Sequence, residues 1–194
     1  MPKSLYSGIL VYLTIFFVLL QLSISTVAFE FEEDTLKAIY SFKFGKFAEW
    51  PETKLNNSKS ALGFCILGKN PFSQTALEII DRAVVKGRKL QIMIFDSGLI
   101  SNDALDECHI LYVSQSEKTR QQPILSALRN KPILTVSDIE GFSQQGGMIT
   151  LINIDQQIQF EINPGAITRA GLEISSKLIE LAKVVNEETP GAKH

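Results

Sequence analysis

The chain is poor in the residues that usually carry catalysis or bind metals. It has two cysteines and two histidines in 194 residues, and His194 is the last residue. His109 lies inside an apolar run, which favours a packed core residue over a zinc ligand. The G-x-S-x-G motif of serine hydrolases is missing, and Gly68-Lys69-Asn70 lacks the second glycine and the Lys-Ser/Thr pair of a phosphate-binding loop. The sequence therefore predicts no enzyme, no cofactor and no metal.

The chain also has no strong excess of positive or negative charge. The net charge is −2, and acidic and basic residues are mixed along the chain without a long block of either. A nucleic-acid-binding protein would present a basic face, so we expect no nucleic-acid partner.

Long hydrophobic runs are confined to the N-terminus. Lys3 precedes an apolar run from Ile9 to Leu22, and small or β-branched residues lead to Ala28. This layout is typical of a cleavable secretory signal peptide; the alternative, an uncleaved membrane anchor, would need roughly 20 apolar residues. No cysteine follows the run, so a lipoprotein anchor is unsupported. We expect a signal peptide at 1–28, one periplasmic domain at 29–187 and a disordered tail at 188–194, with no stable membrane anchor.

Export changes the expectation for the two cysteines. In an oxidising compartment an even pair favours a disulfide, here Cys65–Cys108. The alternative is two separate buried thiols, because free cysteine is often buried.

Apolar strand patterns and helical spacing alternate along the rest of the chain. Strands are predicted at Leu62–Leu67, Leu90–Phe95, Cys108–Val113 and Ile133–Val136, and helices at Leu36–Trp50, Phe72–Arg82, Glu117–Arg129 and after Asn163 and Ser175. We expect Asn70-Pro71 to open the second helix. This alternation predicts a single compact layered α/β domain, with a mixed, mostly parallel sheet, helices on both faces and a C-terminal β-hairpin at Met148–Ile162.

The first helix carries an aromatic stripe of Tyr40, Phe44, Phe47 and Trp50. Such a stripe is either a binding face or part of the core, and we favour the core.

The segment from Lys131 to Asn163 is the most distinctive part of the chain. It contains a strand, a loop shaped by Gly141 and Gly146-Gly147, the hairpin, and an Asn163-Pro164 helix start. These features are typical of a sheet edge with a recognition loop and not of a catalytic motif.

Several strings resemble one family, the periplasmic YfiR-like proteins. In order along the chain they are AIYSFKFGKFAEWP, FCILG with Asn70-Pro71-Phe72, Lys86-Gly87-Arg88, ECHILYVS, PILTVSDIEGFSQQGGMITL, IQFEIN and AGLEISSKLIELA, and together they span 38–185. The GFxxxGGMI string with the following FEIN is the most specific of them.

The resemblance implies a regulator without enzymatic activity. Founding members bind the periplasmic part of an inner-membrane diguanylate cyclase and hold down cyclic-di-GMP synthesis, and an OmpA-like outer-membrane lipoprotein sequesters them. The resemblance also implies a homodimer and a disulfide at Cys65–Cys108. The second cysteine pair of the founding regulators is missing here, so a redox role of that pair does not transfer.

The candidate contact surface for a partner or ligand is the 138–148 loop with the helix start after it. The residues are Asp138, Phe142, Gly146, Gly147, Glu161, Asn163 and Arg169. A loop aromatic can fill a partner's pocket, so Phe142 is either the central contact or a core residue that pins the loop.

Two other functions stay open. A periplasmic small-ligand sensor, feeding a histidine kinase or another receptor, would use the strand ends near Gly68, Ser114 and Ser137. Asp138, Glu140 and Glu161 are carboxylates within the Lys131–Asn163 segment. Two of them would suit an acid/base pair, but polar surface roles are the more common explanation for such residues.

Overall fold

The computed structural model describes residues 33–55, 61–96, 102–155 and 157–187. The expected signal peptide and tail lie outside these ranges. The helices are α2 (Glu33–Phe44), α3 (Gln74–Asp81), α4 (Asn102–Glu107), the 3₁₀ helix η1 (Gln115–Arg120), α5 (Gln121–Leu128), α6 (Pro164–Arg169) and α7 (Ser176–Glu180). The strands are β1 (Ala48–Glu49), β2 (Leu62–Leu67), β3 (Val84–Val85), β4 (Arg88–Phe95), β5 (Cys108–Val113), β6 (Leu134–Ser137), β7 (Ile149–Ile154), β8 (Gln157–Ile162), β9 (Glu173–Ile174) and β10 (Lys183–Val184).

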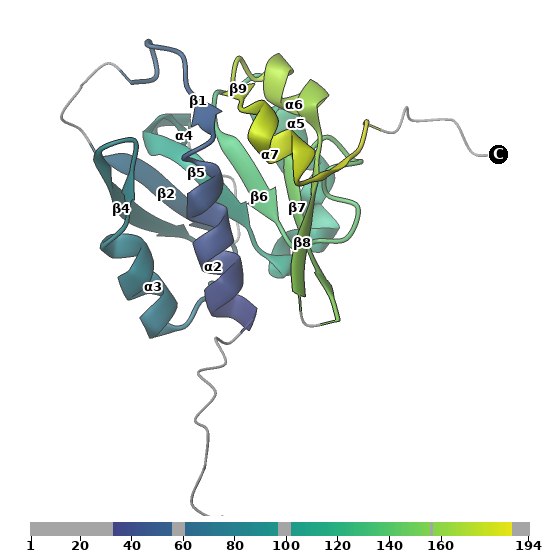
Figure 1. The fold of residues 1–194 in the computed structure, drawn as a ribbon. Coiled ribbons are helices and arrows are strands. Elements are labelled where there is room, and N and C mark those ends of the chain that lie inside the picture. The colour runs from purple at the N-terminus through teal and green to yellow at the C-terminus, as the bar shows by residue number, and fades with distance from the viewer. Residues whose placement is uncertain (1–32, 56–60, 97–101, 156, 188–194) are drawn as a thin grey trace, which may run out of the picture. The chain divides into compact units, whose positions relative to one another are not determined.

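The main sheet has the strand order β10-β8-β7-β6-β5-β2-β4-β3 (Figure 1). Its central strands β4, β2, β5, β6 and β7 run parallel, and the β7–β8 hairpin and the β3–β4 pair are antiparallel. The predicted mixed, mostly parallel sheet with a late hairpin is confirmed.

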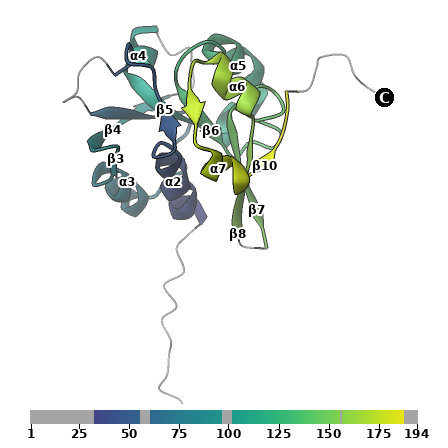
Figure 2. The same cartoon turned by 45° about the horizontal axis from the view of Figure 1, so that its top comes forward.

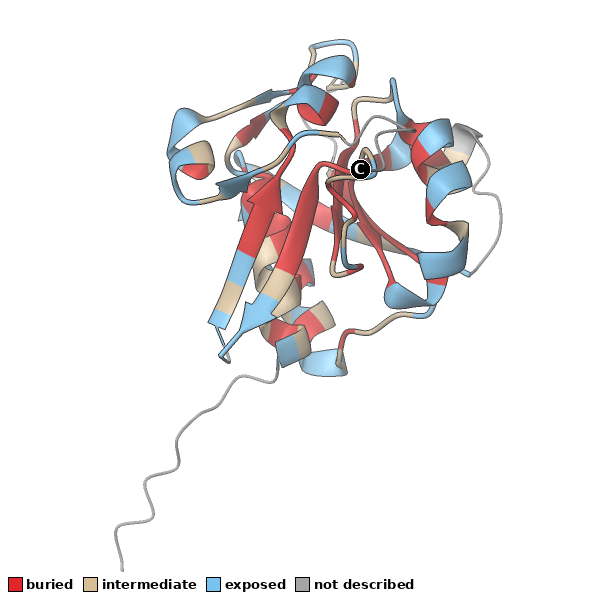
Figure 3. Ribbon diagram, turned by 90° about the vertical axis from the view of Figure 1, so that its right-hand side faces the viewer, coloured by how far each residue is buried: buried red, intermediate tan, exposed pale blue. Residues whose placement is uncertain are grey.

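Helices cover both faces of this sheet (Figure 2). Alternate residues of β2 point to opposite faces, so that Phe64 and Ile66 enter one apolar cluster while Cys65 and Leu67 enter another. The first cluster takes in buried residues of α2, α3, α6 and α7, and the second takes in buried residues of α4 and α5. Buried strands between helices with exposed outer faces are visible in Figure 3. The predicted layered α/β domain is therefore confirmed.

The first helix is shorter than its apolar pattern predicts. α2 ends at Phe44, and the chain then forms β1, which pairs with β9 from the far end of the domain. Phe44 and Trp50 are buried, and Tyr40 and Phe47 are half-buried against the same cluster. The aromatic stripe is thus core, as favoured from the sequence.

The second helix begins later than predicted. Ser73, not Asn70, is the N-cap of α3, because its hydroxyl accepts a hydrogen bond from the Ala76 amide. Asn70 instead closes a local turn, its Oδ1 accepting from the Phe72 amide at 3.0 Å. The predicted caps at Asn163 and Ser175 do start α6 and α7.

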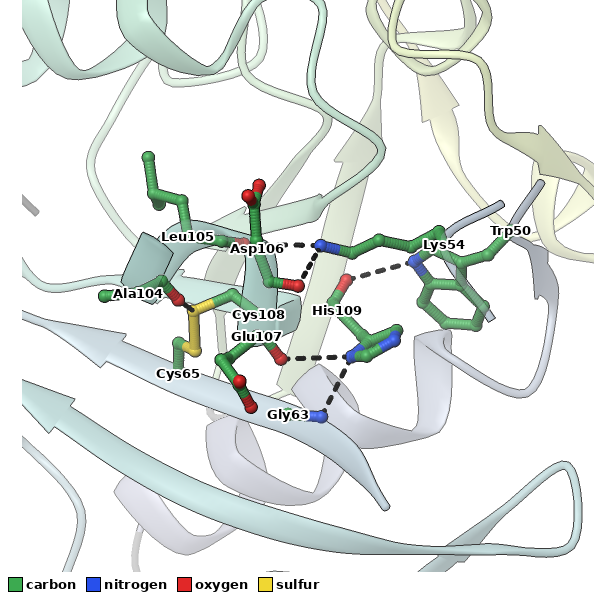
Figure 4. Close-up of a disulfide and its surroundings, with 10 residues drawn as sticks. All are labelled: Trp50, Lys54, Gly63, Cys65, Ala104, Leu105, Asp106, Glu107, Cys108 and His109. Atoms are coloured by element: carbon green, nitrogen blue, oxygen red, sulfur yellow. Dashed lines mark hydrogen bonds between the residues drawn. A yellow bond between two sulfur atoms is a disulfide. The ribbon is translucent and has the colours of Figure 1, made fainter. Parts of the chain in front are cut away.

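A disulfide joins Cys65 on β2 to Cys108 at the start of the neighbouring strand β5, with a Cα–Cα distance of 5.7 Å and a sequence separation of 43 (Figure 4). Both cysteines are fully buried. The bridge predicted from the sequence is present.

His109, next to the disulfide, is a neutral core histidine. Its Nδ1 accepts a hydrogen bond from the Gly63 amide at 3.0 Å, and the Trp50 indole donates to its carbonyl at 3.2 Å (Figure 4). Burial, with the nearby charge of Lys54, lowers the pKa of His109 to about 4. Lys54 Nζ donates to the carbonyls of Leu105 and Asp106 at the end of α4, a favourable place for a cation.

Candidate functional site

The loop after β6 is built around Phe142. This side chain is fully buried in the apolar cluster that also holds the disulfide. Its carbonyl accepts from the Gly147 amide at 2.9 Å, and a Cβ at position 147 would lie 2.3 Å from the Phe142 ring. Gly147 therefore allows the chain to pass directly over the ring. Phe142 is not the exposed partner contact that the sequence suggested; the core alternative is correct.

Asn163 is a second buried support of the loop. Its Oδ1 caps α6 by accepting from the Ala166 amide at 2.9 Å, and its Nδ2 donates to the Ser143 carbonyl at 2.8 Å. The Ser143 amide in turn donates to Thr150 on β7. One side chain thus joins the loop to the helix start, and this buried side chain supports the loop from below.

A pocket of about 670 Å³ opens beside this loop. It lies where the start of α2, the loop and strands β7, β8 and β10 meet, with Gln115 from η1 at its border. Its lining is rich in charged and amide side chains, namely Glu33, Lys37, Gln115, Asp138, Glu140, Gln144, Gln145, Asn153, Glu161 and Lys183.

Lys37 holds together the α2 side of the pocket. Its Nζ lies 2.7 Å from Glu33 Oε1 and 2.9 Å from Asp138 Oδ2, and Asn153 donates to the other Glu33 oxygen at 2.7 Å. The hydrogen bonds from Lys37 and then Asn153 lower the pKa of Glu33. Burial acts to lower the pKa of Lys37, but its bonds to Glu33 and Asp138 outweigh burial and raise that pKa. Glu33 and Lys37 are therefore charged at neutral pH.

Glu161 forms the opposite wall and is only 4% exposed. Lys183 Nζ on the edge strand β10 donates to one of its oxygens at 2.7 Å, and Gln144 Nε2 donates to the other at 2.6 Å. The buried carboxylate is thereby paired and fully hydrogen-bonded, as burial requires.

The Tyr112 phenol lies beside the Asp138 carboxylate. Burial, then the Asp138 charge and a side-chain hydrogen bond with Asp138, raise the pKa of Tyr112, so the phenol stays protonated. Gln144 Oε1 is a buried atom without a hydrogen-bond partner among the described residues.

Gly146 and Arg169 lie apart from this pocket. They border a small cavity of about 40 Å³ in which Arg169 and Arg129 both contact the Glu187 carboxylate. The predicted contact residues therefore divide into Asp138 and Glu161 in the charged pocket, Gly146 and Arg169 beside Glu187, and the supports Phe142, Gly147 and Asn163.

Sequence reasoning missed the lysines of the pocket. Lys37 is 101 residues from Asp138 in sequence, and Lys183 is 22 residues from Glu161. The local sequence pattern predicts neither the Lys37–Asp138 pair nor the Lys183–Glu161 pair. It predicts only an ion pair between Glu33 and Lys37, which lie at positions i and i+4 of a helix.

The strand ends proposed for a small ligand are occupied by the protein's own hydrogen bonds. Ser114 Oγ donates to the Lys69 carbonyl and Ser137 Oγ to the Val113 carbonyl, each at 2.7 Å. A Cβ at Gly68 would lie 2.4 Å from Ser116 Oγ. The pocket lies instead beyond Ser137, beside Asp138.

Two kinds of feature are missing from the described ranges. No group of three or more His, Cys, Asp or Glu side chains converges as metal ligands there. Within the same ranges, no helix is long and apolar enough to cross a membrane.

A comparison with protein families identifies the family of this domain. A family model described as YfiR/HmsC-like matches residues 34–183, from the second residue of α2 to the first residue of β10, and so covers most of the chain and every residue of the charged pocket except Glu33. The proteins of this family are periplasmic, and they are regulatory and not catalytic. The chain belongs to the YfiR/HmsC-like family.

Proposed function

We propose that this protein is a non-enzymatic periplasmic binding protein that restrains an inner-membrane diguanylate cyclase, and so lowers cyclic-di-GMP synthesis. The family match over 34–183 is the observation that carries this proposal. The partner would be the periplasmic part of the cyclase. An OmpA-like outer-membrane lipoprotein would relieve the restraint, and the protein would act as a homodimer after removal of its signal peptide.

The exposed side of the 138–147 loop is the contact surface that we favour. Glu140 and Gln145 are exposed there, above a backbone fixed by the buried Phe142 and Asn163. A rigid loop loses little conformational entropy on binding, which favours it as a recognition element. Asp138, Glu161 and Arg169 would add charged contacts at its borders.

Deletion of the gene in its native host tests the regulatory role. We expect cyclic-di-GMP to rise in the deletion strain and to return to its starting level when the intact gene is supplied. A deletion strain with an unchanged cyclic-di-GMP level would contradict the proposed regulation.

Complementation with surface variants tests the contact surface. The double variant Glu140→Lys/Gln145→Lys reverses the loop's charge, and we expect it to fold and export normally but not to lower cyclic-di-GMP. The matched control is Glu78→Lys/Gln74→Lys, the same residue types exposed on α3. Equal complementation by both variants would exclude the loop as the contact.

A small-ligand sensor that feeds a histidine kinase or another receptor is the second candidate function. The charged pocket favours it, because about 670 Å³ is within the range of small-molecule sites.

A further inference from the structure

Strand β7 has a neighbour on both sides for only part of its length. Its pairing with β6 ends at Thr150, opposite Ser137, whereas its pairing with β8 continues to Ile154. β6 itself ends at Ser137, and the chain leaves the sheet there to form the 138–147 loop. The end of the β7–β8 hairpin therefore projects beyond β6 with one open edge (Figure 1).

The backbone of Asn153 lies on this open edge. In an antiparallel pair, alternate residues direct their backbone groups to opposite sides. The Met148 carbonyl accepts from the Asn163 amide at 2.8 Å, so the even-numbered residues of β7 face β8, and Leu151 and Asn153 face away from it. Since the last pair with β6 is at Thr150, the Asn153 amide and carbonyl have no strand to pair with among the described residues.

The open edge lines the charged pocket, whose lining includes the consecutive residues 150–153. Consecutive side chains of a strand point to opposite faces of a sheet, so a pocket that touches all of these residues lies against the edge of β7. The lining also includes Asp138, Gly141 and Gln145 of the loop. The pocket is therefore a groove between a strand edge and a loop.

This edge lacks the usual protection against strand pairing. Natural proteins blunt open edges with charged side chains, proline or bulges. The edge from Leu151 to Ile154 carries no charge and no proline, and its pairing with β8 has no bulge. Ile154 at its end is 44% exposed. An open strand edge in a groove is an arrangement that binds an extended peptide, because the peptide's backbone supplies the missing hydrogen bonds.

Charge favours a basic peptide over an acidic one. The groove is lined by four carboxylates and two ammonium groups, namely those of Glu33, Asp138, Glu140, Glu161, Lys37 and Lys183. Both lysines already pair with carboxylates of the groove. The exposed Glu140 belongs to none of these ion pairs, so a cationic side chain of the peptide would gain a partner there.

We propose that the charged pocket is a groove for an extended basic segment of a protein partner, which pairs with the open edge of β7 as an added strand. The segment's backbone bonds to the Asn153 amide and carbonyl, and a lysine or arginine side chain faces Glu140. The proposal rests on the proposed function only in assigning the segment to the cyclase. Peptide binding is measured on the purified protein and cyclic-di-GMP in the deletion strain, so the failure of either is recognised separately.

Selection from a random heptapeptide library, with the purified protein as bait, supplies the probe. We expect enrichment of heptapeptides that combine lysine or arginine with β-branched residues, because such sequences suit both the charge of the groove and an extended conformation. The most enriched heptapeptide, made synthetically, should bind one to one in a calorimetric titration. Enrichment of no heptapeptide, or of acidic ones, would overturn the proposal.

Amide hydrogen exchange, followed by NMR, shows whether the heptapeptide pairs with β7. We expect the Asn153 amide to exchange about 10-fold more slowly when the heptapeptide is bound, since it gains a hydrogen bond. The Ile152 amide, which faces β8, is the matched control and should change little. An Asn153 amide that is unaffected by saturating heptapeptide would exclude strand pairing.

Methylation of single backbone nitrogens of the heptapeptide gives an independent test. A methyl group removes the donor and blocks pairing, so methylation at alternate positions should weaken binding about 10-fold, and methylation between them should have little effect. Equal tolerance at every position would mean that side chains alone hold the peptide, and would reject the added strand.

The variant Glu140→Gln locates the charge contact. We expect it to weaken the heptapeptide about 3-fold, as for an exposed ion pair. Glu78→Gln on α3 is the matched control and should bind as the native protein does. Equal affinity of the two variants would place the peptide outside the groove. Free arginine that binds as tightly as the heptapeptide would show a small-ligand site and would also reject the proposal.

Discussion

The disulfide region and the charged pocket lie on one sheet but handle buried polar groups differently. Around Cys65–Cys108, neutral backbone groups are the main partners: His109 accepts from the Gly63 amide, and Lys54 donates to carbonyls at the end of α4. In the charged pocket, the carboxylates of Glu33, Asp138 and Glu161 pair with Lys37 and Lys183. The first region is therefore held by hydrogen bonds to the backbone, whereas the second is held by ion pairs between side chains.

Phe142 connects the two regions. It belongs to the apolar cluster of the disulfide and lies in the loop that lines the pocket. Phe142→Asp should therefore lower the free energy of unfolding by more than about 5 kcal/mol, because it removes a buried ring and buries a charge. We expect loss of folded protein in a urea titration. A folded variant with normal stability would show that the loop packs independently of the core.

Removal of the disulfide should have the next largest effect. The bridge closes a loop of 43 residues, and the chain-entropy relation assigns about 4 kcal/mol to a loop of that length. We expect Cys65→Ala/Cys108→Ala to lose that much free energy of unfolding in a urea titration. A loss below about 1 kcal/mol would mean that packing alone fixes β2 against β5.

Lowering the pH should reduce the free energy of unfolding, because the fold holds His109 neutral. Its folded pKa, about 4, lies below the ordinary histidine pKa of 6.5, so the unfolded chain binds an extra proton between these values. Stability present above pH 6.5 is lost as the pH falls towards 4, by about 2–3 kcal/mol. Urea titrations at pH 7 and 4.5 measure this loss. His109→Asn keeps an acceptor for Gly63 without titrating, and an unchanged pH dependence in that variant would remove His109 as the cause.

The smallest effect is expected in the pocket. Lys37→Met should cost about 2 kcal/mol, because it leaves two carboxylates without their partly buried partner. The Lys37 and Asp138 side chains are 13% and 12% exposed. Arg82→Met breaks the exposed pair with Glu78 and should change stability by less than about 0.5 kcal/mol. Equal losses of stability in Lys37→Met and Arg82→Met would show that burial adds nothing to the ion pairs of Lys37.

Sequence reasoning predicted the regular parts of the fold well. Apolar runs such as Leu62–Leu67 and Cys108–Val113 are strands with every residue buried, because a central parallel strand is covered on both faces. The prediction from sequence was wrong where pairing with a distant segment determines the secondary structure. β1 replaces the end of the first predicted helix because it pairs with β9.

The candidate site was predictable only in part. The glycine-shaped loop indicated a special segment, and Asp138 and Glu161 do line one pocket. The direction in which Phe142 points depends on packing against residues of α4, α5 and β5, which local sequence does not reveal. Lys37 and Lys183 come from the two ends of the domain, so their role depends on the tertiary fold.

The pairing of β1 with β9 also bears on the order of folding. Ala48 lies opposite Ile174 in this pair, and Lys183 lies beside Glu161 at the sheet edge. Contacts of such long range form late, since the intervening chain must first be brought together. The domain cannot close until nearly all of it has been synthesised. A chain whose synthesis stops before Glu173 would therefore lack the strand that pairs with β1.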